Sequence, residues 1–272
     1  MQQLTANVFV EVQQRGANHG LVVTSEGVVL IDTPQKPTDA LLLRQQVVEH
    51  GPVRFIINTE PHLDHWTGNA FFEAPIIAHT GVRQRMVETD PASFAERAET
   101  MGEENLKLMR DYTIKLPTIT YTDRLTLRLG DHTFECILMP GHTPFQSAVF
   151  IPEERVVFTS DNVFCRVQTF LHEAVPDLWL KSLEELRSLE ADILVPGHGE
   201  TCGKDYLDEQ AAFIREWLAL VRDAFNRGMS KEEAMEQLSL LDRYPMDVEI
   251  EYMGPMVMQR NVSRLYDLLA SP

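Results

Sequence analysis

Residues 58–69 read NTEPHLDHWTGN, and this short polar stretch decides how the rest of the chain is interpreted. It follows the apolar run 53–57, which is typical of a short buried strand, and its proline and polar residues indicate a loop at the end of that strand. Side chains that can bind a metal ion fall close together in it: Glu60, His62, Asp64 and His65. Because divalent cations accept carboxylate oxygens and imidazole nitrogens, the stretch predicts a metal site.

The spacing of these side chains predicts their arrangement. In an extended chain, side chains repeat on one side at every second residue, so Glu60, His62 and Asp64 are expected to face the same way. His65 is adjacent to Asp64 and would reach the same cavity through a turn.

Three later motifs accompany the first one, namely residues 140–143 (PGHT), 160–162 (SDN) and 196–199 (PGHG). Together, the four motifs resemble the metallo-β-lactamase fold superfamily, whose usual first motif is His-x-His-x-Asp-His. Glu60 stands where the first His of that motif would stand. The resemblance runs from about residue 8 to residue 200, and the motifs occur in the family's order.

The resemblance implies a centre for two divalent cations. Its first metal would be bound by Glu60, His62 and His142, its second by Asp64, His65 and His198, and Asp161 would bridge the two. Two such cations lie roughly 3.5–4 Å apart and share a hydroxide, which serves as the nucleophile. Asp64 would also act catalytically by orienting the hydroxide and passing on its proton.

The implied activity is that of a dinuclear metal-dependent hydrolase acting on a small carbonyl substrate. An ester, a lactone, a thioester or an amide such as a β-lactam would suit a lactonase-like or esterase-like enzyme. Two other classes stay open. One is an iron-dependent redox enzyme of the same fold, and the other is a degenerate, non-catalytic binding protein.

Glu60 leaves the metal itself open. Zinc is the expected metal, but a carboxylate in place of an imidazole hardens the first site, so manganese or iron are alternatives. Glu60 is interpreted either as an equivalent ligand, as a change that leaves the site weakly occupied, or as a general base that swings away from the metal.

Residues outside the ligand set are also candidates for the site. The resemblance places substrate contacts after Asp161, which suggests His172, Phe164 and Phe170, and His19 is a further candidate near the mouth. Asp32 is expected either to support the metal loop through hydrogen bonds or simply to cap a turn.

The order of the expected elements fits an α/β (α+β) fold. Short β-rich runs alternate with helical segments up to residue 203, which matches the family's four-layer αβ/βα sandwich. Segment 80–111 is helix-prone; the resemblance implies that it borders the cleft, and the alternative is a surface helical pair that covers the edge of the sheet. We therefore predict a catalytic domain, 1–203, followed by a C-terminal helical extension, 204–272, packed on it.

The extension is expected to contain three helices, at 206–226, 231–241 and 253–269. A homo-oligomer could form through these helices. Deleting the extension is expected to harm solubility or assembly more than the metal site.

Composition limits the partners. The formal charge of −17 argues against binding to nucleic acid or to an anionic membrane surface, whereas a small-molecule substrate, even an anionic one, stays compatible with a dinuclear cation site. The first fourteen residues show no signal-peptide pattern, and the three cysteines are widely spaced. A cytoplasmic location is therefore expected.

Overall fold

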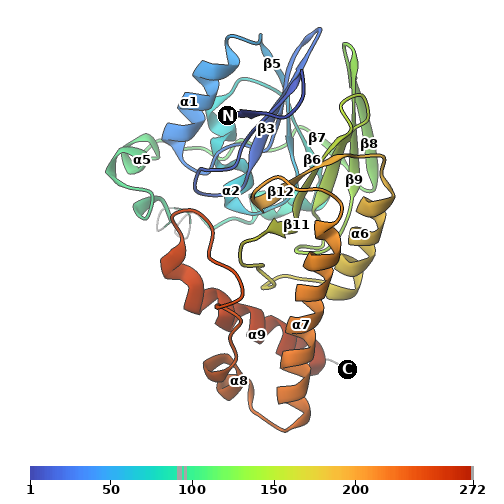
Figure 1. Ribbon diagram of the computed structural model, residues 1–272. Helices are drawn as coiled ribbons and strands as arrows, with labels where there is room; N and C mark the ends of the chain where they lie inside the picture. Colours follow the sequence, from blue (N-terminus) through green and yellow to red (C-terminus); the bar gives the residue numbers. More distant parts are fainter. Residues whose placement is uncertain (91–93, 95–96, 271–272) are drawn as a thin grey trace.

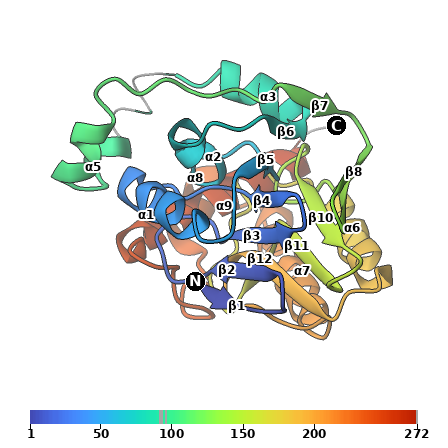
Figure 2. The same cartoon turned by 90° about the horizontal axis from the view of Figure 1, so that it is seen from above.

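The computed structural model describes residues 1–90, 94 and 97–270. Two β-sheets face each other, and helices cover the outer face of each, so that the chain forms four layers (Figures 1 and 2). The predicted four-layer αβ/βα sandwich is confirmed. The C-terminal helices extend away from the sheets at the lower end of Figure 1.

The first sheet contains seven strands in the order of the chain. These are β1 (Gln2–Gln3), β2 (Val8–Glu11), β3 (His19–Thr24), β4 (Gly27–Ile31), β5 (Val53–Asn58), β6 (Ile76–His79) and β7 (Ile119–Tyr121). Strands β1 to β4 are antiparallel and β4 to β7 are parallel. Gly27 turns the β3–β4 hairpin with a φ of 124°, a conformation that suits glycine because it lacks a Cβ.

The second sheet has the order β12-β11-β10-β9-β8. Its strands are β8 (Arg124–Leu129), β9 (His132–Leu138), β10 (Ser147–Ile151), β11 (Val156–Cys165) and β12 (Ile193–Gly199). Only β11 and β12 pair in parallel. Apolar side chains such as Val22, Phe134 and Phe158 fill the space between the two sheets and are almost fully buried. Their burial is the main stabilising contribution to the sandwich.

Helices fill the connections. They are α1 (Pro37–Val47), α2 (Leu63–Trp66), α3 (Thr80–Val87), α5 (Glu103–Leu108), α6 (Pro176–Ser188), α7 (Tyr206–Asn226), α8 (Lys231–Gln237) and α9 (Gly254–Ala270), with 3-10 turns η1 (Thr67–Phe71) and η2 (Glu251–Met253). The three helices predicted after residue 203 are confirmed. Part of the helix-prone segment 80–111 lies outside the described residues. No helix in the described part of the chain is long and apolar enough to span a membrane.

The extension shares its core with the second sheet. One buried cluster joins Phe164 of β11 and Trp179 of α6 to Trp217 of α7 and Val262 of α9. Apolar packing is therefore continuous across residue 203. The division into domains 1–203 and 204–272 stays a prediction.

The structure corrects one local prediction around the metal motifs. Helix α2 begins at Leu63, so Asp64 lies in a helical turn and not in an extended segment, whereas the turn expected at His65 is present. The 3-10 turn η1 follows directly after α2. Asp161 and His198 lie within β11 and β12, and both strands continue past a register shift in their pairing.

The shared core generates a stability prediction. Ile214 is fully buried in α7, so Ile214→Ala should lower the free energy of unfolding by about 2–5 kcal/mol through lost packing and a cavity. Urea unfolding followed by both circular dichroism and tryptophan fluorescence should show one shifted transition.

Leu268→Ala is the control, since Leu268 in α9 is 37% exposed and its loss should change stability by less than about 0.5 kcal/mol. A separate early transition of the extension would contradict the shared core.

Candidate metal centre

All seven predicted ligands lie around one point where the ends of the two sheets meet. One group of facing ligand atoms, each within 4.8 Å of the others, comes from Glu60, His62, His142 and Asp161. A second such group comes from Asp64, His65 and His198. The structure thus brings the predicted set together in the predicted division, although their role as metal ligands stays a prediction.

Asp161 lies between the two groups. Its Oδ1 is 3.2 Å from His65 Nε2, and its Oδ2 is 3.4 Å from His198 Nε2 and 3.6 Å from His142 Nε2. A carboxylate in this position reaches imidazoles of both groups, as the predicted bridging role requires.

The two groups contain four imidazoles, those of His62, His65, His142 and His198. One nitrogen of each ring points to an acceptor outside the centre, and the other nitrogen faces the centre. His65 Nδ1 is 2.8 Å from Asp32 Oδ2, and His198 Nδ1 is 2.7 Å from Asp247 Oδ2. His142 Nδ1 is 2.6 Å from the carbonyl oxygen of Phe170. His62 differs, since its Nε2 is 3.5 Å from Glu173 Oε1 and forms no hydrogen bond with a described residue. Such outer contacts fix the tautomer and the ring orientation of metal-binding histidines.

Asp32 supports the motif loop as well as His65. Its Oδ1 accepts a hydrogen bond from the backbone N–H of Thr59 at 2.8 Å, and its Oδ2 accepts one from the Thr59 hydroxyl at 2.5 Å. Of the two interpretations of Asp32, the structure supports the one in which it holds the metal loop.

Asp247 was not found from the sequence. It lies in the segment before α9, in a Pro-containing acidic stretch that carries no motif. Its carboxylate is nevertheless nearly buried against His198. This contact brings a residue of the extension to one of the predicted ligands, His198.

Gly197 of the second PGH motif is required by close packing. A Cβ at this position would lie 1.8 Å from Asp161 Oδ1, which no side chain could accommodate. Gly141 is similar, since its Cβ would lie 1.9 Å from Asn162 Oδ1. The glycine before each histidine therefore allows two strands to approach around Asp161.

The carboxylates create a strongly negative potential at the centre. Burial opposes protonation of His62, yet the charge of Glu60 raises the pKa of His62 to about 10. Burial likewise opposes charging of His65 and His198, but nearby carboxylates, Asp161 among them, hold the pKa of each well above its usual value. A site that favours positive charge so strongly is suited to a cation.

Unpaired atoms also fit a cation. Glu60 Oε2, His65 Nε2 and Asp161 Oδ1 are buried and have no hydrogen-bond partner among the described residues. Buried polar atoms of this kind are costly unless something binds them. Their donor set of carboxylate oxygens and imidazole nitrogens is the set that zinc and neighbouring divalent metals accept.

A cavity of about 390 Å³ opens onto the centre. His62, Asp64, His142, Asp161 and His198 lie at its base. Its walls carry the basic residues Arg15, Arg97 and Arg260 and the apolar residues Phe170, Ile250, Met253, Met256 and Val257. Most of the apolar wall therefore comes from the C-terminal extension.

A comparison with protein families matches residues 12–198 to the metallo-beta-lactamase superfamily. This segment contains all seven predicted ligands and covers more than half of the chain. The chain belongs to the metallo-beta-lactamase superfamily. The resemblance inferred from the four motifs is thereby confirmed.

Two curated proteins are similar to this superfamily member. A linear primary-alkylsulfatase from Pseudomonas sp. is 22% identical over 262 residues, covering 81% of this chain and 49% of that protein. A hydroxyacylglutathione hydrolase from Brucella ovis is 29% identical over 231 residues, covering 84% and 76%. The chain thus spans about half the length of the alkylsulfatase.

Solved structures of the superfamily share the fold. A metallo-beta-lactamase family protein from Thermus thermophilus has a TM-score of 0.71 at 20% identity and covers 98% of this chain and 95% of its own. An inverting sec-alkylsulfatase from Pseudomonas sp. has a TM-score of 0.73 at 16% identity, with 98% and 49% covered. Because 98% of this chain is aligned, the common fold includes C-terminal helices.

The four predicted substrate contacts occupy different places around this superfamily centre. His172 and Phe170 line the cavity. Phe164 is buried and stacks on His198, with 5.2 Å between ring centroids, so it supports a predicted ligand from behind. His19 is buried in β3 and is not among the described residues that line the cavity. A substrate role for any of them stays a prediction.

Asp247 provides the first test of the centre. Asp247→Ala should weaken metal binding by about 10–100-fold, because His198 loses the acceptor that orients its ring. Competition with a chromophoric chelator would measure the change. Asp242→Ala, which removes a carboxylate of the same segment that lies outside the cavity, is the matched control. Equal affinity in the two variants would show that Asp247 does not position His198.

The burial of His19 predicts acid sensitivity. Burial lowers its pKa to about 4, whereas the unfolded chain protonates near 6.5. The unfolded state therefore binds a proton that the folded state does not, and stability falls as the pH drops from about 6.5 to 4, by up to about 3 kcal/mol. His19→Gln should lose less stability than the wild type between pH 7.5 and pH 4.5 in urea unfolding. Identical pH dependence of the two proteins would contradict this.

Proposed function

We propose that this chain is a metal-dependent hydrolase of a small ester, with two divalent cations held by the seven predicted ligands. The observation that carries the proposal is the orientation of three histidines, His65, His142 and His198. Each is hydrogen-bonded to an outer acceptor through Nδ1 and presents its other nitrogen to Asp161. Zinc is the proposed metal, since imidazole nitrogens make up at least half of the ligand atoms in both groups.

Cations bound at this centre would supply a water of lowered pKa as the nucleophile and would polarise the reacting oxygen of the substrate. The chain's own residues perform the rest. Asp64 lines the cavity with its carboxylate 3.4 Å from His198 Nε2. We propose that it orients the attacking water and passes on its proton, and its position on the cavity lining supports this role.

The walls of the cavity favour a substrate with an anionic group. Arg15 is nearly buried, and its guanidinium donates to the carbonyl and hydroxyl oxygens of Thr100 at 2.7 Å each. Neither Arg15 nor Arg260 forms an ion pair with a carboxylate of the described residues. A positive charge at the cavity that no carboxylate of the described residues neutralises is suited to binding an anion.

The apolar wall indicates a second part of the substrate. Met253, Met256 and Val257 face the same space as the arginines. Methionine side chains adapt to varied apolar shapes. We therefore favour a carboxylic ester or thioester that combines an acyl or alkyl chain with an anionic group, and the similarity to a hydroxyacylglutathione hydrolase supports this choice.

A sulfate ester is the second candidate. The unpaired arginines would suit its sulfate group, and the similarity to a linear primary-alkylsulfatase supports it. We further propose that the enzyme is cytoplasmic and acts on a small molecule. Its C-terminal helices are the proposed interface of a homo-oligomer. An iron-dependent redox enzyme stays the alternative if iron is the metal found.

The proposal predicts that metal and turnover are lost together. His142→Ala and Asp161→Ala should each lose most of the bound metal and of the hydrolysis of acyl esters, thioesters, lactones, β-lactams and alkyl sulfates. Metal analysis of protein purified without added metal, together with this substrate panel, would measure both.

His132→Gln is the control, because His132 is also buried but pairs with Asp131 and Glu154 at the other end of β9 from the His142 loop. Full metal content and activity in either ligand variant would refute the assignment. Iron with oxygen consumption would favour the redox enzyme.

A further inference from the structure

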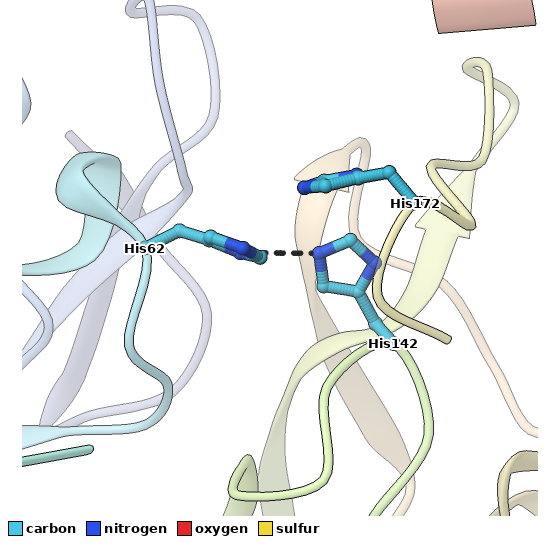
Figure 3. Close-up of side chains that lie close together, drawn as sticks. All are labelled: His62, His142 and His172. Carbon is cyan, nitrogen blue, oxygen red and sulfur yellow. Dashed lines mark hydrogen bonds between the residues drawn. The ribbon is translucent and has the colours of Figure 1, made fainter. Parts of the chain in front are cut away.

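A third group of potential ligands lies on the cavity side of the centre. His62, His142 and His172 each present a ring nitrogen within 4.8 Å of the others. Their ring centroids are 5.0 Å apart for His62 and His142, 5.0 Å for His62 and His172, and 5.3 Å for His142 and His172. Figure 3 shows the ring of His172 lying above that of His142, with both facing His62.

The spacing suits one metal ion. Zinc binds imidazole nitrogens at about 2.0–2.1 Å, so the nitrogens of a tetrahedral site lie about 3.4 Å apart. His62 Nδ1 and His142 Nε2 are 3.2 Å apart. His172 brings a ring nitrogen within 4.8 Å of the ligand atoms of both. Its ring nitrogens form no hydrogen bond with any other described residue, so they are available.

The backbone around His172 is held in place from both sides. The N–H of Leu171 donates to Asn261 Oδ1 of α9 at 2.7 Å, and the carbonyl of Phe170 accepts from His142 at 2.6 Å. After His172, Arg264 donates to the carbonyl of Ala174 at 2.9 Å and 3.0 Å. The approach of His172 to the centre is therefore fixed by helix α9 and not by a free loop.

Glu60 approaches from the opposite, inner side. It is completely buried, and its Oε1 is 2.9 Å from His62 Nδ1 and 3.3 Å from His65 Nε2. Glu60 therefore contacts a histidine of each group and does not lie beside the first group alone. With Glu60 in place of the motif's first His, only His62 and His142 would supply imidazoles there.

We infer that His172 supplies the third imidazole of the first metal, in place of the one that Glu60 replaces. This inference rests on the metal centre of the proposed function. It changes the expected first site from a carboxylate with two imidazoles to three imidazoles with a buried carboxylate beside them. That set favours zinc over harder metals despite the glutamate.

Metal affinity tests the inference without reference to turnover. In the full-length protein stripped of metal, His172→Ala should weaken one of two Zn²⁺-binding events by at least about tenfold in chelator competition, comparable with losses seen when the surroundings of a metal ligand are removed. Co²⁺ titration should show the visible spectrum of the same site altered. Met256→Ala, which removes another side chain that lines the same cavity, should leave both events unchanged. His172→Gln serves if the alanine variant does not fold.

A double-mutant cycle tests whether His172 compensates for the imidazole that Glu60 replaces. In a Glu60→His background an imidazole returns to the motif, so His172→Ala should cost clearly less affinity than it does beside Glu60. An equal loss of Zn²⁺ affinity in both backgrounds would overturn the inference. Wild-type Zn²⁺ affinity in His172→Ala would also overturn it and would leave His172 as a substrate contact. If the wild-type protein binds no Zn²⁺ at all, the proposed function fails as well.

Discussion

Three imidazoles from three separate parts of the chain converge on the buried carboxylate of Asp161, at distances of 3.2–3.6 Å. Much of the local structure serves this convergence. Ser160, just before Asp161, has a φ of 52°, and the pairing of β11 with β12 shifts its register on both sides of Ser160. Gly197 leaves out the side chain that would collide with the carboxylate. The irregular strand and the glycine are best understood as consequences of bringing Asp161 and His198 together.

The C-terminal extension completes the centre. Asp247 orients His198, and Asn261 of α9 holds the segment that carries His172. The same extension contributes the apolar wall of the cavity and shares a buried cluster with β11 and α6. Polar contacts at the centre and apolar packing beneath it both join residues before 203 to residues after it. The C-terminal helices are therefore part of the site that they cover.

The electrostatics of the molecule differ between its surface and its cavity. The whole chain is strongly acidic, and the centre itself is dominated by carboxylates that attract cations. Arg15 and Arg260 form a basic rim above it. A bound divalent pair would offset the carboxylates, so that metal and rim together would attract an anionic substrate. The acidity of the chain therefore argues against large anions such as nucleic acid without excluding a small anionic ester.

The sequence by itself determined the family, the order of the elements and the seven predicted ligands, because these depend on local motifs such as residues 58–69 and on local patterns of apolar side chains. Only the tertiary structure decided which residues surround those ligands. Asp247 and His172 stand in stretches without a motif, and they reach the centre through the packing of helices far away along the chain. The helical position of Asp64 in α2 was also beyond the sequence, since alternation describes an extended chain and this part of the loop is not extended. Contacts between distant segments depend on how helices and sheets pack, and a local pattern carries no information about them.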